Sequence, residues 1–255
     1  MIRFRDPNEP DGLSRLINRQ IDAALETERA GQPLRDYLGA SVLGDPCDRR
    51  LAYQYAGVAP DLPTGRNIRI FEAGHALQAL MSRWLRLAGF DLIDVDPNTG
   101  REFEFSIAGD RVRGHADGII GKGPHIGACY PLLWEAKALN SAAWSDLTMR
   151  GLRPAKPGYF AQVQVYLYEF DLAACLFTAL NKDSAGLYHE LVPIEEGFGE
   201  WLVARGIAIA DLVDRGAIPA RIDDRRACRG CPYHAHCYGA ELSLYRRAEE
   251  PAAAE

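Results

Sequence analysis

The chain has 255 residues, of which 47% are hydrophobic and 25% are charged, and its formal net charge is −6. This composition is ordinary for a globular protein with one large domain, and no apolar run is long enough to span a membrane. The acidic balance disfavours a protein that coats nucleic acid through bulk charge. The first residues lack an apolar signal core, so we expect a cytoplasmic protein.

Helices are predicted in the N-terminal region, residues 1–66. A loose arm is expected over residues 1–12, and apolar residues at helical spacing predict a helix over 13–30. A short helix is expected from Asp48 to Tyr55, after a cap at Asp45, and residues 57–66 are expected to form a loop.

Residues 67–195 are predicted to form a core with alternating element types. Apolar residues form a stripe along an expected helix at 67–88. Turn-bounded apolar segments then predict an antiparallel meander of three strands. The elements expected in chain order are strands at 102–107, 111–120 and 130–139, a helix at 157–170, and strands at 173–180 and 186–192.

The C-terminal region, residues 196–255, is expected to contain a helix at 196–215, a cysteine-rich stretch at 228–237 and a disordered tail at 249–255. We expect all three regions to form one integrated domain.

Two opposite charges lie in the apolar strand expected at 130–139. Side chains alternate along a strand, so Glu135 and Lys137 point to the same face. A buried strand rarely carries such groups unless they are paired or bind a metal ion or a substrate. Taken alone, the pair is best interpreted as a structural ion pair on a half-exposed strand.

Asp117 lies on the preceding strand, so adjacent pairing would bring it beside Glu135. Two neighbouring carboxylates repel each other unless a cation lies between them. Mg²⁺ prefers a few carboxylates together with water and phosphate oxygens. Lys137 could orient a water molecule or stabilise charge on a phosphate. These are the parts that phosphodiester hydrolysis needs.

Two predicted helices carry further polar candidates. His75 flanks the apolar stripe of the helix at 67–88, where a lone histidine is more often a satisfied core residue. Gln162 and Tyr166 are four residues apart and therefore project from one helix face. They could hold a phosphate backbone or orient a catalytic group, although alone they would be a boundary pair.

Cysteines are concentrated near the C-terminus, where Cys228, Cys231 and Cys237 have the spacing C-x2-C-x5-C. In a cytosolic protein this spacing indicates metal ligands. Zinc accepts three cysteines and one histidine, whereas iron–sulfur clusters prefer four thiolates. The candidates for a fourth ligand are Cys47, His234, His236, Cys129 and Cys175.

The carboxylate motifs together resemble the PD-(D/E)xK nuclease superfamily, in its RecB-like exonuclease branch. That branch has a helix histidine, a Gly-x-x-Asp strand, a Glu-x-Lys strand and a Gln-x-x-x-Tyr helix, in this order. The corresponding residues are His75, Gly114 with Asp117, Glu135 with Lys137, and Gln162 with Tyr166.

This resemblance implies a restriction-endonuclease-like α/β (α+β) fold with a central mixed β-sheet flanked by helices. It implies that Lys137 is the catalytic lysine and that Gln162 and Tyr166 belong to the catalytic set. The ligands that it implies for Mg²⁺ or Mn²⁺ are His75, Asp117, Glu135 and the backbone carbonyl of Ala136.

The cysteines resemble those of the iron–sulfur RecB-like nucleases, which include the CRISPR-associated exonuclease family and the nuclease domain of AddAB-type helicase–nucleases. The resemblance covers residues 40–240 and implies a 4Fe-4S cluster. The ligands that it implies are Cys47, Cys228, Cys231 and Cys237. The acidic net charge departs from what this family suggests and puts tight non-specific DNA binding in doubt.

Such a cluster would join the N-terminal and C-terminal regions and constrain the unfolded chain. It would also gather two basic runs into one candidate path for a DNA strand. The arginines concerned are Arg49, Arg50, Arg225, Arg226 and Arg229.

The expected function is therefore a metal-dependent DNA exonuclease acting on single strands or DNA ends. The setting could be CRISPR adaptation, phage or mobile-element DNA processing, or repair, with DNA as the partner. CRISPR adaptation proteins, recombination proteins and a homo-oligomer remain open as further partners. The competing hypotheses are a DNA-binding or assembly component with little nuclease activity, and a zinc-stabilised module whose carboxylates form structural ion pairs.

Overall fold

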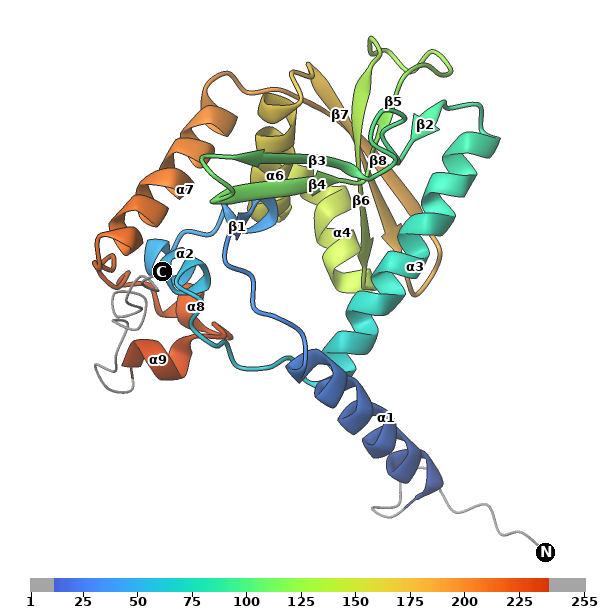
Figure 1. Cartoon of the computed structure of the whole chain (residues 1–255). Coiled ribbons are helices and arrows are strands. Elements are labelled where there is room, and N and C mark those ends of the chain that lie inside the picture. The colour runs from blue at the N-terminus through green and yellow to red at the C-terminus, as the bar shows by residue number, and fades with distance from the viewer. Residues whose placement is uncertain (1–11, 239–255) are drawn as a thin grey trace, which may run out of the picture.

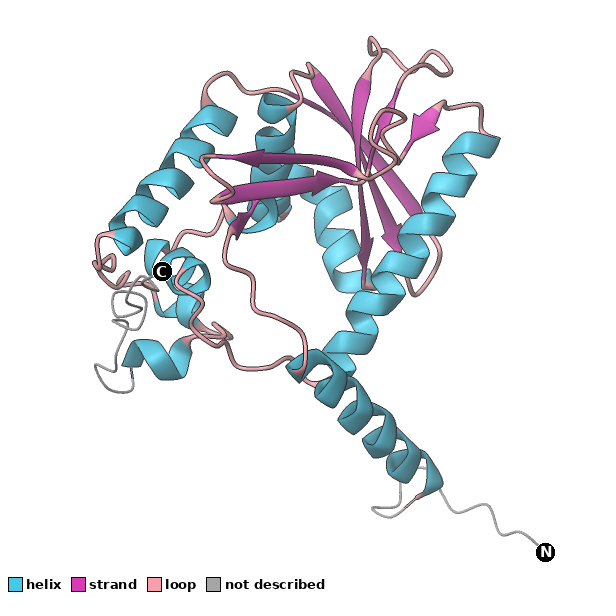
Figure 2. Ribbon diagram, viewed as in Figure 1, coloured by secondary structure: helices cyan, strands magenta, loops and turns pink. Residues whose placement is uncertain are grey.

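The computed structural model describes residues 12–238 as two β-sheets with helices packed around them (Figure 1, Figure 2). Most of the expected N-terminal arm and all of the expected tail lie outside these residues. Within this range, no helix has the length and apolar character that crossing a membrane requires.

The helices and strands expected from the sequence are present, except that the strand expected at 111–120 is divided between two sheets, so the expected three-strand meander was wrong. The helix α4 (Ser141–Arg150) and several short elements are added. In chain order the elements are α1 (Leu13–Ala30), β1 (Leu38–Gly39), the 3-10 helix η1 (Ala40–Val42), α2 (Asp48–Tyr55), α3 (Gly65–Leu87), β2 (Leu92–Ile93), β3 (Phe103–Ile107), β4 (Val112–Ala116), β5 (Gly118–Ile120), β6 (Leu132–Leu139), α4 (Ser141–Arg150), α5 (Leu152–Ala155), α6 (Pro157–Glu169), β7 (Ala174–Asn181), β8 (Leu187–Pro193), α7 (Phe198–Asp214), α8 (Arg225–Cys228) and α9 (His234–Tyr238).

The central sheet has five strands in the order β2-β5-β6-β7-β8. β6 pairs antiparallel with β5 and parallel with β7, and β7 pairs antiparallel with β8. The chain returns from the end of β6 to the start of β7 through α4, α5 and α6, as a parallel pair requires. The expectation of a mixed sheet flanked by helices is therefore confirmed.

The second sheet has three strands in the order β1-β4-β3. The single strand expected at 111–120 is divided into β4 and β5, which belong to different sheets, and Asp117 is the residue between them. The break releases Asp117 from regular pairing at the point where the two sheets meet.

Two apolar clusters cover the two faces of the central sheet. Leu133 and Phe177 pack against α6 in one cluster, and Trp134 and Leu176 pack against α3 in the other. These pairs are neighbours along β6 and β7, so the alternation of the strand divides the core between two faces. We call them the α6 face and the α3 face.

The first half of α3 and the whole of α1 lie beside the main body rather than in it (Figure 1). The apolar stripe expected on the helix at 67–88 is buried only in its second half, where Met81 and Leu85 are 1% and 8% exposed. Ile70 and Phe71 in the first half are 38% and 59% exposed, because this part of α3 extends past the sheet.

Candidate active site

β6 places the two charges of its Glu-x-Lys motif on the α6 face. Glu135 is fully buried, and the side chain of Lys137 is 22% exposed. The Lys137 ammonium forms an ion pair with Oε1 of Glu135. The ion pair anticipated from the sequence therefore exists, but it lies in a buried strand and reaches solvent through Lys137.

Asp117 lies beside Glu135 at the end of the neighbouring strand. Gly118 is in register with Trp134, so the residue before Gly118 reaches the level of Glu135. Oδ2 of Asp117 accepts a hydrogen bond of 2.8 Å from the backbone N–H of Ala136. Adjacent pairing of the two strands therefore brings the carboxylates together, as the sequence predicts.

Burial dominates the electrostatics of these three groups. It raises the pKa of Glu135 to about 7, with a further contribution from the Asp117 carboxylate and opposition from Lys137. Burial also raises the pKa of Asp117. Burial disfavours the Lys137 ammonium, but the charges of Glu135 and Asp117 outweigh it and raise the pKa of this lysine. Two carboxylates therefore share a single cation.

One carboxylate oxygen in this group has no hydrogen-bond partner among the described residues. Oε2 of Glu135 is buried and unsatisfied. An unpaired buried carboxylate oxygen is costly, and a bound cation removes that cost. Two carboxylates and a backbone carbonyl are hard oxygen ligands, which Mg²⁺ and Mn²⁺ prefer. The residues present therefore fit a divalent cation.

His75 is exposed on α3 and is not gathered with the two carboxylates. Across residues 12–238, no three side chains of the His, Cys, Asp or Glu type are grouped so that they could hold a metal ion. α3 meets the site through Gln78 instead, whose side chain hydrogen-bonds to Asp117. His75 lies about one turn earlier, on the part of α3 that extends past the sheet.

Gln162 and Tyr166 are buried and connect α6 to β4. Nε2 of Gln162 donates to the Tyr166 hydroxyl at 3.3 Å, and that hydroxyl donates to the backbone oxygen of His115 at 2.7 Å. Burial, followed by the charge of Glu135, raises the pKa of Tyr166. The tyrosine therefore remains a neutral donor that holds β4 against α6.

Gly114 supplies the space for this tyrosine. A Cβ atom at position 114 would lie 2.4 Å from the ring of Phe105 and 2.7 Å from the ring of Tyr166. Both distances are shorter than any normal contact, so a side chain there would displace one ring. This close packing explains why the Gly-x-x-Asp motif has glycine at position 114.

Sequence reasoning missed two residues of the site, Gln78 and Tyr159. Gln78 is three residues after His75 and so lies on nearly the same side of α3. The Tyr159 ring centroid lies 5.2 Å from Nζ of Lys137, near the start of α6. The sequence signal for Tyr159 was its spacing of seven residues from Tyr166, which places both tyrosines on one side of α6.

The N-terminal segment around Cys47 contacts the cysteine-rich stretch. The Tyr53 and Tyr233 rings are 5.7 Å apart, and the backbone N–H of Asp61 donates to the Pro232 carbonyl at 2.7 Å. Cys47 lies close enough to Cys231 for the thiol of Cys231 to contribute to the raised pKa of Cys47, which burial mainly causes. The two ends of the expected clasp therefore meet.

The four expected cluster ligands are all described but do not form a metal-binding group of three or more in residues 12–238. Sγ of Cys228 lies 3.6 Å from the Tyr238 hydroxyl. Of the other candidates, Cys175 is fully buried in β7, whereas Cys129 is exposed. The cluster thus stays a prediction from the sequence.

The arginines near Cys47 and the cysteine-rich stretch differ in their contacts. Nε of Arg49 donates to the Pro219 carbonyl at 2.7 Å, and Arg50 forms an ion pair with Asp45 at 2.8 Å. Arg226 and Arg229 are exposed, and the side chain of Arg225 lies outside the described part of the chain. Arg49 and Arg50 therefore have structural partners, and the proposed basic path remains a prediction.

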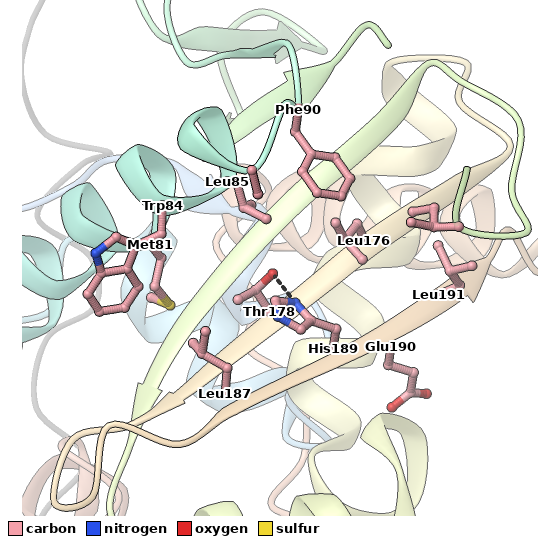
Figure 3. A pocket seen from close by; sticks show the side chains of 12 residues that line it. Met81, Trp84, Leu85, Phe90, Leu176, Thr178, Leu187, His189, Glu190 and Leu191 are labelled. Carbon is pink, nitrogen blue, oxygen red and sulfur yellow. Dashed lines mark hydrogen bonds between the residues drawn. The ribbon is translucent and has the colours of Figure 1, made fainter. Parts of the chain in front are cut away.

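A cavity of about 540 Å³ lies on the α3 face, between α3, β7 and β8 (Figure 3). Its lining is apolar apart from Thr178 and His189, which are hydrogen-bonded at 3.2 Å, and Glu190, which is directed away in Figure 3. Glu135 and Lys137 lie on the opposite face of the sheet, so this cavity is separate from the carboxylate group.

No protein-family profile matches the chain. A 70-residue segment is 36% identical to 2,3-bisphosphoglycerate-dependent phosphoglycerate mutase from Cytophaga hutchinsonii. The segment is 27% of this chain and spans only 33% of that enzyme, so it does not show membership of that family.

Solved structures give a broader likeness. The structure named SSO0001 is 17% identical, with 90% of this chain and 98% of that chain covered and a TM-score of 0.48. The alkaline exonuclease LHK-Exo from Laribacter hongkongensis is 16% identical, with 76% and 97% covered and a TM-score of 0.45. LHK-Exo in complex with dAMP is 15% identical, with 78% and 93% covered and a TM-score of 0.50. The chain thus has a fold like that of LHK-Exo in its dAMP complex, with a mixed sheet flanked by helices as the sequence predicts.

Proposed function

We propose that this protein is a Mg²⁺- or Mn²⁺-dependent deoxyribonuclease that acts as an exonuclease on single-stranded DNA or DNA ends. The observation that carries the proposal is the unpartnered buried oxygen of Glu135, next to Asp117 and Lys137. A protein that used these charges only as an ion pair would gain nothing from leaving that oxygen unsatisfied.

Asp117, Glu135 and the Ala136 carbonyl are the proposed metal ligands. The sequence motif adds His75 as a further ligand, which α3 would have to bring closer to the two carboxylates than it lies here. A bound divalent cation would lower the pKa of a coordinated water and neutralise charge on the phosphate. Lys137 has a raised pKa and so stays protonated, which suits it to orient the attacking water or stabilise developing negative charge. Gln162 and Tyr166 hold β4 and α6 around this group.

DNA is the proposed substrate and partner. The likeness to an exonuclease structure that contains dAMP supports a site that accepts a nucleotide product. The exposed Arg226 and Arg229, together with the other arginines near Cys47, are the proposed contacts for a DNA strand. We place this activity in the cytoplasm, in CRISPR adaptation, mobile-element DNA processing or repair.

The nuclease proposal is tested with DNA labelled at either end, in single-stranded and double-stranded form, with Mg²⁺ or Mn²⁺. We expect shortening from an end by the wild type, and a rate at least about 100-fold lower for Glu135→Ala and Lys137→Ala. Lys182→Ala is the control, because this lysine is exposed in a turn. Equal degradation by all four proteins would show contamination and end the proposal.

The proposal also includes a structural 4Fe-4S cluster, held by Cys47, Cys228, Cys231 and Cys237. The contact between the Cys47 segment and the cysteine-rich stretch supports it. Oxygen-protected wild-type protein should be brown, and Cys231→Ser should lose the colour and melt at a lower temperature. An unchanged melting temperature of Cys231→Ser would contradict the clasp. Wild-type protein that is colourless and contains zinc would show that the four cysteines form a zinc site and not an iron–sulfur cluster.

The second candidate is a DNA-binding or assembly component with little nuclease activity. The exposed position of His75, away from the two carboxylates, is the observation that favours it. DNA binding without shortening of any labelled end in the assay above would select this candidate.

A further inference from the structure

β8 is the last strand of the central sheet, and its outer edge has no strand partner among residues 12–238. The ladder with β7 fixes which residues face that edge. Asn181 donates to the Gly186 carbonyl at 2.8 Å and Ile194 donates to the Ala173 carbonyl at 2.9 Å, so even-numbered residues of β8 bond to β7. The N–H and C=O groups of Leu187, His189 and Leu191 therefore point outward.

The same three residues carry the apolar side of the edge. Their side chains line the cavity on the α3 face, and Leu187 and Leu191 are 44% and 37% exposed (Figure 3). On α3, Trp84 lines the cavity, and Leu80 and Leu87 nearby are 42% and 71% exposed. Free backbone groups thus occur next to an uncovered apolar surface, which is the combination that strand addition uses.

We propose that β8 pairs antiparallel with β8 of a second copy of this chain, around a two-fold axis through His189. This register places Leu187 of one copy opposite Leu191 of the other, and Tyr188 opposite Glu190. All outward N–H groups of the strand then meet outward carbonyls of the other copy. The apolar side chains of both copies gather on the α3 face, over the mouths of the two cavities.

The sequence of β8 favours this register over its neighbours. An axis through Glu190 would set two carboxylates directly opposite each other, which is unfavourable. It would also place Pro193, which has no N–H to donate, opposite Leu187. An axis through Tyr188 would pair Leu187 with His189 and leave Leu191 opposite residue 185, outside the strand. The strand is therefore most self-complementary around His189.

A second copy suits this edge better than a nucleic acid does. The cavity lining contains no lysine or arginine, and the one charged residue of β8 is Glu190. Nucleic acid would need cations along the edge to contact its phosphates. A partner for the β8 edge needs apolar side chains and backbone N–H and C=O groups that match those of β8, and an identical strand supplies both.

The test is sedimentation equilibrium of the full chain up to about 100 µM, with charge-swap variants. Leu187→Lys/Leu191→Lys sets lysine against lysine across the axis and should raise the dimer Kd at least about tenfold. Leu187→Lys/Leu191→Glu sets lysine against glutamate and should restore most of the dimer. Leu34→Lys/Leu62→Lys changes two exposed loop residues and should leave the Kd unchanged.

A wild type that stays monomeric would overturn the proposal. A dimer that the Leu187→Lys/Leu191→Lys variant does not weaken would also overturn it, because another face would then form the dimer. Equal weakening of the dimer by both charge variants would show that the proposed register is wrong. Hydrogen exchange of the wild type provides a test without substitutions. The amides of Leu187, His189 and Leu191 should exchange more slowly at high protein concentration than at low concentration, and equal rates would contradict the pairing.

Discussion

The two faces of the central sheet differ in what they leave uncovered, although the same strands build them. On the α6 face, Glu135 is fully buried with an oxygen that lacks a hydrogen-bond partner among the described residues. On the α3 face, Trp134 is equally buried, but its indole N–H donates to the Thr178 hydroxyl at 3.1 Å. One face has an unsatisfied charge, and the other has a satisfied core next to an open apolar cavity.

Adjacent residues can therefore have different roles, because alternating side chains of a strand point to opposite faces of the sheet. Trp134 and Glu135 are neighbours in the chain, yet one packs under α3 and the other lies below α6. We infer that the α3 face supplies stability and that the α6 face supplies the chemistry.

The largest effect on stability is expected from the α3 face. Trp134→Ala should lower the free energy of unfolding by about 3–5 kcal/mol, since it opens a cavity and removes the indole hydrogen bond to the Thr178 hydroxyl. Denaturant unfolding measures this change. Trp201→Ala is the matched control. Trp201 is 55% exposed on α7 and stacks on Phe198 at its surface, so its removal should cost only about 1 kcal/mol. Similar losses for both variants would contradict the separation of the faces.

A smaller effect is expected on the α6 face, and it depends on pH. Burial and the Asp117 charge raise the pKa of Glu135 from 4.5 to about 7, so the folded protein binds this proton more tightly than the unfolded chain does. The stability that this tighter proton binding provides is fully present below pH 4.5, and the metal-free protein loses it as the pH rises through about 7.

Glu135→Gln removes the titrating group and keeps the shape of the side chain, so it isolates this term. Urea unfolding of the metal-free wild type and variant, from pH 4 to 8, should give a stability difference that shifts in favour of the variant as pH rises. A difference that does not change with pH would show that the Glu135 carboxylate is not strained by burial.

The sequence predicted the order of elements well where the signal was local. The bounds of α1 and of α2, from Asp48 to Tyr55, agree with those expected. The expected cap at Asp45 was wrong, because the N-cap residue of α2 is Cys47, and Asp45 lies two residues before it and accepts a hydrogen bond from the Cys47 N–H. α4 and α5 were missed because residues 141–155 have no strong apolar period. The parallel pairing of β6 with β7 also depends on the path of the chain between them, which local spacing does not encode.

The site was partly predictable for the same reason. Glu135 and Lys137 share a face by alternation, and Asp117 reaches Glu135 by simple pairing of consecutive strands. The role of Gln78 could not be read from the sequence, because it depends on how α3 crosses the sheet. For His75, the helix was predicted correctly, but that crossing leaves the histidine exposed.

The central claim is that the carboxylates on the α6 face are held together to bind a cation. The most direct measurement is Mn²⁺ binding at pH 8, followed by the loss of the electron paramagnetic resonance signal of free Mn²⁺. We predict that the wild type binds Mn²⁺, and that Glu135→Gln and Asp117→Asn each weaken the affinity at least about tenfold. Glu169→Gln, which changes a partly buried carboxylate at the end of α6, should bind like the wild type. Equal binding by all four proteins, or no binding by the wild type, would contradict the account.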